Sequence, residues 1–136
     1  MTELKDLILI GFTGHRNRTI SESYLDLTRK RFPNAIWYHG GAAGFDTQVK
    51  RYAERYNIPQ VIVEPDYEQY GRKVAPLVRN REIVNQVSLL IACYNGRKRG
   101  GTFYTINYCR NNHPNMPVII INPDTQEVHH VKTKHH

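Results

Sequence analysis

Cysteine and long apolar runs are both scarce in this sequence. The two cysteines, Cys93 and Cys109, lie inside apolar segments and lack the spacing of metal ligands. This pattern excludes a disulfide-rich secreted scaffold and fits a reducing cytoplasm. The first apolar run, 7–12, is too short for the apolar region and cleavage site of a signal peptide, and no segment is long enough to span a membrane. We therefore expect a cytoplasmic protein without a membrane partner.

Acidic residues are under-represented relative to basic ones. The chain has 12 Asp and Glu against 19 Lys and Arg, which gives a formal net charge of +7. This excess favours an anionic partner, and nucleotides, phosphate and nucleic acid all fit it. The basic residues are spread along the chain apart from one cluster at 97–99, so no continuous stripe for nucleic acid is evident.

Five apolar runs alternate with four helical patterns. Apolar strands separated by helices are typical of a parallel sheet that is covered on both sides. We predict an α/β fold, a Rossmann-like three-layer sandwich with a five-stranded, mainly parallel sheet and helices on both faces. The predicted strands are 7–10, 35–38, 60–63, 89–93 and 117–121. The predicted helices are 21–32 with Ser21 as N-cap, 45–57, a helix that has Pro76 in its first turn and ends near 87, and 102–112, with an irregular stretch over 64–75.

Residues 1–122 form one predicted domain, followed by a polar tail over 123–136. The tail shows neither helical nor strand periodicity. It holds four of the seven histidines, His129, His130, His135 and His136. A metal-binding tail is one interpretation, but composition favours an ordinary flexible terminus. We expect neither a metal nor a cofactor.

Glycine and arginine concentrate in the loops that follow the first four strands. In open parallel sheets, ligands lie beyond the carboxyl ends of the strands, where the strand order reverses. The loops expected at this edge are 13–18, 40–46, 64–72 and 95–102. Together they describe a site for an anionic group that the backbone approaches closely.

Two of these loops open a helix with glycines. The segments 40–46 and 100–102 have the strand–turn–helix context that can cradle phosphate, although glycines also make tight turns in any α/β fold. The Thr102 hydroxyl is either a further phosphate donor or a plain N-cap. A carboxylate would repel phosphate, so Asp46 is expected to cap its helix or to accept ribose hydroxyls.

Five short segments occur in a fixed order after the first four strands: 14–16, 41–46, 70–72, 76–80 and 100–102. In this order they resemble the SLOG superfamily, specifically its small YspA-like branch, over roughly residues 7–122. The superfamily also includes the DNA-processing protein DprA and the LOG phosphoribohydrolases. The resemblance implies a Rossmann-like pocket for nucleotides or nucleotide-derived ligands, which YspA-like proteins sense or process near phage-conflict and nucleotide-signalling systems. Relatives of this fold often pair through helices, which implies a homo-oligomer.

The resemblance also implies which residues contact the ligand. It assigns the first loop to the pocket wall, the second to the sugar-phosphate, the next helix to further ligand contacts and the last loop to phosphate. The residues in this order are Gly14, His15 and Arg16; Gly41, Gly44 and Asp46; Arg79 and Asn80; and Gly100, Gly101 and Thr102.

One departure from the phosphoribohydrolases affects the predicted activity. Those enzymes carry an acidic residue soon after the Thr of their glycine loop, whereas Thr102 is followed here by Phe-Tyr-Thr. N-glycosidic hydrolysis needs a group that stabilises the ribosyl cation or activates water. Asp46, Glu64 and Glu82 are the available substitutes, and Asp46 and Glu82 are the catalytic candidates if the protein is an enzyme. We predict ligand binding first, N-glycosidic hydrolysis as the alternative, and DprA-like binding of single-stranded DNA third.

Histidine and tyrosine side chains at this edge have two interpretations each. The ordinary pKa of histidine suits His15 to acid–base chemistry, but a neutral donor or structural role is favoured beside Arg16. His39, at a strand end, is expected to pack or cap. Tyr67, Tyr70 and Tyr94 either stack on a base or cover the core.

Overall fold

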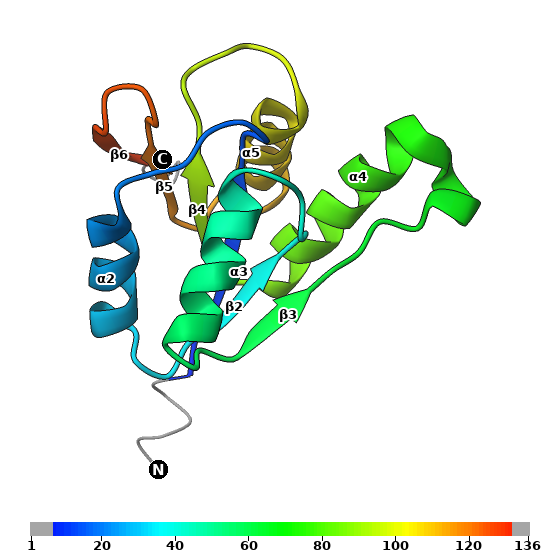
Figure 1. Cartoon of the computed structure of the whole chain (residues 1–136). Coiled ribbons are helices and arrows are strands. Elements are labelled where there is room, and N and C mark those ends of the chain that lie inside the picture. Colours follow the sequence, from blue (N-terminus) through cyan, green and yellow to red (C-terminus); the bar gives the residue numbers. More distant parts are fainter. Residues whose placement is uncertain (1–6, 132–136) are drawn as a thin grey trace.

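A six-stranded sheet forms the middle layer of the molecule (Figure 1). The computed structural model describes residues 7–131 of the chain. The strands are β1 (Leu9–Gly14), β2 (Ile36–His39), β3 (Gln60–Ile62), β4 (Leu89–Cys93), β5 (Val118–Ile121) and β6 (Val128–Val131). Their order is β3-β2-β1-β4-β5-β6, in which β1 to β5 run parallel and β6 runs antiparallel to β5. The predicted α/β fold with a mainly parallel sheet is confirmed.

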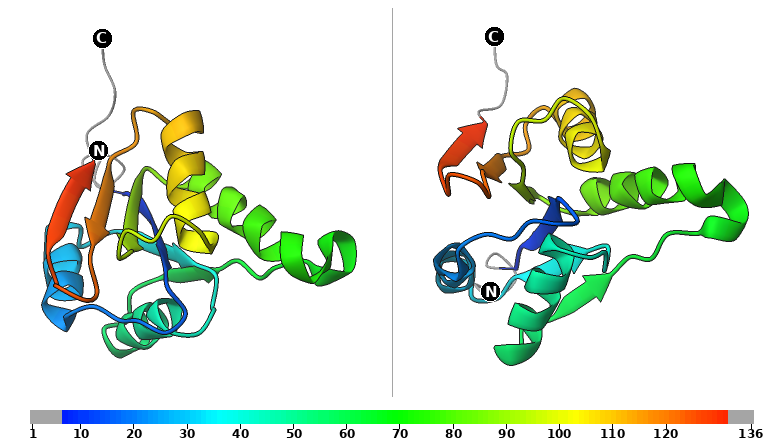
Figure 2. Two further views of the ribbon diagram at one scale, coloured as in Figure 1. Left: turned by 90° about the horizontal axis from the view of Figure 1, so that it is seen from above. Right: turned by 45° about the horizontal axis from the view of Figure 1, so that its top comes forward.

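Two helices cover each face of the sheet (Figure 2). On one face lie α2 (Glu22–Arg31) and α3 (Phe45–Arg55). On the other face lie α4 (Tyr67–Gln86) and α5 (Gly101–Asn112). Ser21 is the N-cap of α2, as predicted, and its Oγ accepts a hydrogen bond from the Ser23 N–H at 3.4 Å. No helix within residues 7–131 is long and apolar enough to cross a membrane.

The sixth strand lies in the segment that was predicted to be a polar tail. Val128 pairs with Ile121, and Val131 pairs with Val118. Two adjacent exposed histidines, His129 and His130, separate the valines and remove the alternation by which a strand is recognised. The strand forms because β5 offers it an open edge. The predicted sheet of five strands therefore lacked one strand. The other two histidines of the predicted tail, His135 and His136, lie outside the described residues.

Helix α4 begins earlier than predicted. Most of the stretch 64–75, predicted to be irregular, is helical from Tyr67 onward, and Asp66 Oδ1 caps it by accepting from the Gln69 N–H at 3.0 Å. Gly71, with a φ of 80°, breaks the helix into two pieces, and the first piece projects from the body (Figures 1 and 2). Pro76 lies five residues beyond this break, so it is not in the first turn of a helix as predicted.

Apolar side chains fill the space on both faces of the sheet. Phe12 and Trp37 lie 4.7 Å apart between their ring centroids, and Trp37 stacks on Tyr52 of α3 at 5.6 Å. Burial raises the pKa of Cys93 to about 12 and that of Cys109 to about 11, so both free thiols stay protonated and inert. This packing fixes the positions of the carboxyl ends of the strands relative to one another.

Candidate ligand-binding site

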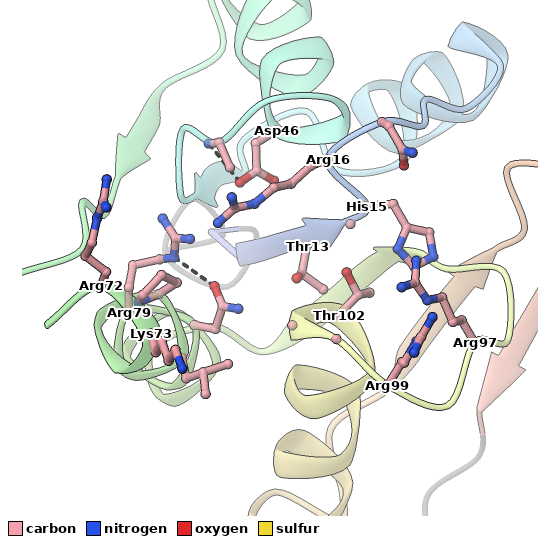
Figure 3. Close-up of a pocket in the computed structure, with 18 residues that line it drawn as sticks. Thr13, His15, Arg16, Asp46, Arg72, Lys73, Arg79, Arg97, Arg99 and Thr102 are labelled. Carbon is pink, nitrogen blue, oxygen red and sulfur yellow. Dashed lines mark hydrogen bonds between the residues drawn. The ribbon is translucent and has the colours of Figure 1, made fainter. Parts of the chain in front are cut away.

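A cavity of about 550 Å³ opens at the carboxyl ends of β1 and β4 (Figure 3). The strand order reverses between these two strands, because β1 continues to β2 on one side while β4 continues to β5 on the other. This is the place where open α/β sheets bind ligands. The lining comes from the loop after β1, the loop after β2, the helix α4, and the loop that leads into α5.

Most of the predicted ligand-binding residues line this cavity. They are Gly14, His15, Arg16, Asp46, Arg79, Asn80, Gly100, Gly101 and Thr102. Gly41 and Gly44 are not among the lining residues, and neither is Glu82, the second catalytic candidate. Glu82 is exposed on α4, and its backbone carbonyl accepts a hydrogen bond from Gln86 at 3.0 Å.

The loop after β1 packs directly on the start of α3. A Cβ atom on Gly14 would lie 2.5 Å from the Phe45 ring, so only glycine fits this contact. A Cβ atom on Gly44 would lie 2.3 Å from the backbone of Arg16, and the Phe45 N–H donates to the His15 carbonyl at 3.2 Å. Gly44 therefore joins two loops, and one N–H group at the start of α3 is already bonded within the protein.

The loop after β2 is fastened by buried side chains. The Gly41 N–H donates to His39 Nδ1 at 3.0 Å, and His39 Nε2 lies 2.8 Å from Gln60 Oε1. The Gly40 carbonyl accepts from Arg79 Nη1 at 2.7 Å, and a Cβ atom on Gly40 would lie 2.2 Å from that guanidinium. His39 is thus a packed, loop-capping residue, in agreement with the expectation.

Asp46 is the one carboxylate among the lining residues. Its side chain is buried, and Oδ2 accepts from the Ala42 N–H at 3.2 Å. Oδ1 accepts no hydrogen bond from the described residues. Burial raises the pKa of Asp46, while the backbone N–H groups of Ala42 and Gly40 and the charge of Arg79 act in the opposite direction. The site therefore contains a buried acceptor that lacks a donor.

The N-terminus of α5 faces the cavity with its first residues exposed to it. Gly100 precedes the helix with a φ of 96° and a ψ of 175°, which favours glycine. The N-cap is Gly100, so Thr102 is not an N-cap, which was one of its two interpretations. The first N–H groups of a helix have no partner within it and carry positive potential. This end of α5 is suited to an anion.

Six basic side chains surround the cavity. Arg16 and Arg79 were expected there, whereas the other four were not assigned to the site from the sequence. The six are Arg16, Arg72, Lys73, Arg79, Arg97 and Arg99. The signal for Arg72, Arg97 and Arg99 was their position in two loops predicted at this edge, whereas Lys73 directly follows the first of these loops. Six cations around one carboxylate make the cavity strongly attractive to anions.

His15 anchors the loop that precedes α5. Its Nε2 lies 3.1 Å from both the backbone nitrogen and Oδ1 of Asn95. Burial lowers the pKa of His15, the Asn95 contact opposes this shift, and the charges of Arg97 and Arg18 reinforce it. The ring is therefore neutral near pH 7, in keeping with a structural or hydrogen-bonding role.

The tyrosines at this edge do not line the cavity. Tyr67 and Tyr70 are exposed on the projecting piece of α4. Tyr94 donates to the Arg97 carbonyl at 2.6 Å, and its ring lies 5.8 Å from that of His15 between centroids. Tyr94 therefore shapes the loop after β4.

The turn between β5 and β6 supports the first loop from outside. Arg18 forms an ion pair with Asp124 at 3.0 Å, and the Ser21 N–H donates to Gln126 Oε1 at 2.7 Å. Tyr24 donates to the Gln126 carbonyl. Part of the predicted tail thus helps to position the loop that carries His15.

No group of three His, Cys, Asp or Glu residues within 7–131 is arranged to hold a metal ion.

Comparisons with known proteins add no assignment. No family model matches the chain, and neither the curated proteins nor the solved structures contain a significantly similar one.

Proposed function

We propose that this protein binds a nucleotide or a nucleotide-derived small molecule in the cavity, as a sensor or sequestering module. The observation that carries the proposal is the convergence of six basic side chains and one buried carboxyl group at the point where the strand order reverses. Guanidinium groups and a helix N-terminus bind phosphate, and a carboxylate accepts ribose hydroxyls. The cavity of about 550 Å³ lies within the usual size range of small-molecule pockets.

Asp46 supports a nucleotide over a bare phosphate. A buried carboxylate beside a phosphate would repel it, whereas a sugar hydroxyl would supply the donor that Oδ1 lacks. The resemblance to YspA-like proteins agrees with a ligand that combines phosphate with a sugar.

The test is thermal unfolding of the full chain with a panel of nucleoside mono-, di- and triphosphates, cyclic dinucleotides and ADP-ribose. A ligand that binds the folded state stabilises it by mass action, by about 4 kcal/mol at a thousandfold excess over Kd. At least one compound is expected to raise the Tm, and Arg99→Ala should reduce the shift. Arg110→Ala is the control, because Arg110 is an exposed arginine near the other end of α5. Unchanged Tm values across the panel would refute the proposal.

The alternative is N-glycosidic hydrolysis of nucleotides, and the environment of Asp46 favours it. Its raised pKa and its place among the lining residues fit a group that acts on the glycosidic bond. Free base should then be released from nucleoside monophosphates, Asp46→Asn should abolish this release, and Glu82→Gln should leave it unchanged because Glu82 lies outside the lining. Absence of released base with all common nucleotides would exclude this activity.

Two further expectations from the sequence have their own measurements. Binding of single-stranded DNA would appear as a gel shift that weakens with salt and with neutralisation of Arg97, Lys98 and Arg99. A homo-oligomer would appear in size-exclusion chromatography with light scattering, and a monomeric mass would contradict it.

A further inference from the structure

Four of the six basic side chains of the cavity form two pairs on opposite sides of it, and Arg16 lies between these pairs, next to Asp46 in the view of Figure 3. Arg72 and Lys73 come from α4, and Arg97 and Arg99 come from the loop that leads into α5. Figure 3 shows the first pair at one side of the cavity and the second pair at the other, with Thr13 and Thr102 between them. The N-terminus of α5 adds its positive potential to the second pair.

These four side chains are not neutralised by carboxylates of the protein. The ion pairs within residues 7–131 join Arg18 to Asp124, Arg29 to Asp26, Lys50 to Glu54 and Arg55 to Glu22. None of them involves a basic residue of the cavity. Arg79 is different, because it is buried and its Nη1 and Nε bond to the Gly40 carbonyl and Asn80 Oδ1. Arg79 supports the wall, while the two pairs remain available to an anion.

Asp46 lies between the two pairs in the same view (Figure 3). Asp46 is only 7% exposed, and its Oδ1 accepts no hydrogen bond from residues 7–131. A buried acceptor is stabilised by a donor, and an anionic group cannot provide one. The wall between the two basic pairs therefore offers a hydrogen-bond acceptor to a hydroxyl-bearing part of a ligand.

From this arrangement we infer that the cavity has two separate anion subsites, and that its ligand is a nucleotide with phosphate groups at two separated positions of the sugar. A nucleoside 3′,5′-bisphosphate has this form, because the ribose that carries its free 2′-hydroxyl lies between the two phosphates. A nucleoside 5′-diphosphate places both phosphates at one end and leaves the opposite basic pair without a counter-charge. The inference rests on the proposed function, because it specifies the ligand class of the same cavity.

The experiment is calorimetric titration of the full chain at fixed ionic strength with three probes: the 5′-monophosphate, the 5′-diphosphate and the 3′,5′-bisphosphate of adenosine, repeated with guanosine. The bisphosphate is expected to bind at least tenfold more tightly than the diphosphate of the same base, although both carry two phosphates. The slope of log Kd against log salt should also be steeper for the bisphosphate than for the monophosphate.

Paired variants locate the two subsites. Arg72→Ala with Lys73→Ala, and separately Arg97→Ala with Arg99→Ala, should each weaken the bisphosphate at least tenfold, to about the affinity of the monophosphate. Lys98→Ala is the matched control, because Lys98 is an exposed cation in the same loop that does not line the cavity. Far-UV circular dichroism and Tm confirm that each variant is folded.

The failure of this inference differs from the failure of the proposed function. If the diphosphate binds as tightly as the bisphosphate, or if one basic pair can be removed without effect, the two-subsite assignment is wrong and nucleotide binding still stands. If none of the probes binds, both proposals are overturned.

Discussion

The loop after β2, residues 40–44, and the loop after β4, residues 94–100, are both rich in glycine and both lead into a helix. In the first loop, a Cβ atom on Gly40 or Gly44 would lie 2.2 or 2.3 Å from atoms of Arg79 or Arg16. In the second loop, an added Cβ on Gly96 or Gly100 meets no heavy atom within 4 Å. The first set of glycines serves contacts within the protein, and the second set leaves the backbone open.

This difference separates scaffold from binding surface at one edge of the sheet. The first loop bonds to His39, Asp46, Thr47 and Arg79, so its polar groups are largely used. The second loop carries exposed arginines and ends at a helix N-terminus that faces the cavity. A glycine-rich turn therefore does not by itself indicate a phosphate site, because the same residues are needed for close packing.

The largest expected effect on stability comes from disrupting the loop 40–44, called the packed loop below; the loop 94–100 is called the open loop. Gly44→Ala should lower the free energy of unfolding by about 4 kcal/mol, since its φ of 75° and ψ of −122° strain any side chain and its Cβ would strike the backbone of Arg16. Urea-induced unfolding measures the change. Gly101→Ala is the control at the first residue of α5, directly after the loop 94–100; the new Cβ would lie 3.8 Å from Asn80, and we expect a change within about 0.5 kcal/mol. Equal losses of unfolding free energy in the two variants would contradict the distinction between a packed loop after β2 and an open loop after β4.

Removing the Arg79 side chain, which bonds to the packed loop, should have a smaller effect on stability. Arg79→Ala leaves the buried Gly40 carbonyl without its donor and is expected to destabilise by about 2 kcal/mol. Arg72→Ala removes an exposed arginine of the same helix and should change stability by less than about 0.5 kcal/mol. A neutral effect of Arg79→Ala in urea unfolding would show that Arg79 is not a support of this wall.

Asp46 gives a pH-dependent contribution of smaller size. Its pKa is raised in the folded protein above the ordinary value of 3.8, so the folded state binds the proton more tightly than the unfolded state. Stability from this group is greatest below pH 3.8 and is lost as pH rises through the raised pKa. Asp46→Asn removes this dependence, so the Tm of the variant minus that of the wild type should increase with pH across this window. A difference that is constant with pH would contradict the assignment.

The smallest effect on stability is expected in the open loop. Arg97→Ala with Arg99→Ala should change the free energy of unfolding by less than about 0.5 kcal/mol, since both side chains are exposed. The same double variant should weaken nucleotide binding at least tenfold in calorimetric titration. A destabilised variant with unchanged affinity would reverse the roles given to the two loops.

Much of the fold was predictable from local patterns. Apolar runs such as 89–93 are strands that are buried on both faces, and the spacing of Phe45, Val49 and Tyr52 matches one face of a helix. β6 was missed because His129 and His130 interrupt its alternation, and only pairing with β5 makes it a strand. The start of α4 was missed because Gly71 and Pro76 suggested an irregular stretch. In the structure Gly71 alone has non-helical dihedral angles, and the chain is helical on both sides of it.

The sequence by itself determined the alternation of strands and helices, the excess of positive charge, and the loops in which glycine and arginine would meet at one edge. These features depend on residues close together in the chain. Only the tertiary structure decided that Gly44 packs on Arg16, that Glu82 stays outside the cavity, and that Arg72 and Arg97 stand on opposite sides of Asp46. Those relations join residues far apart in the chain, and their distances are set by how helices pack on a twisted sheet.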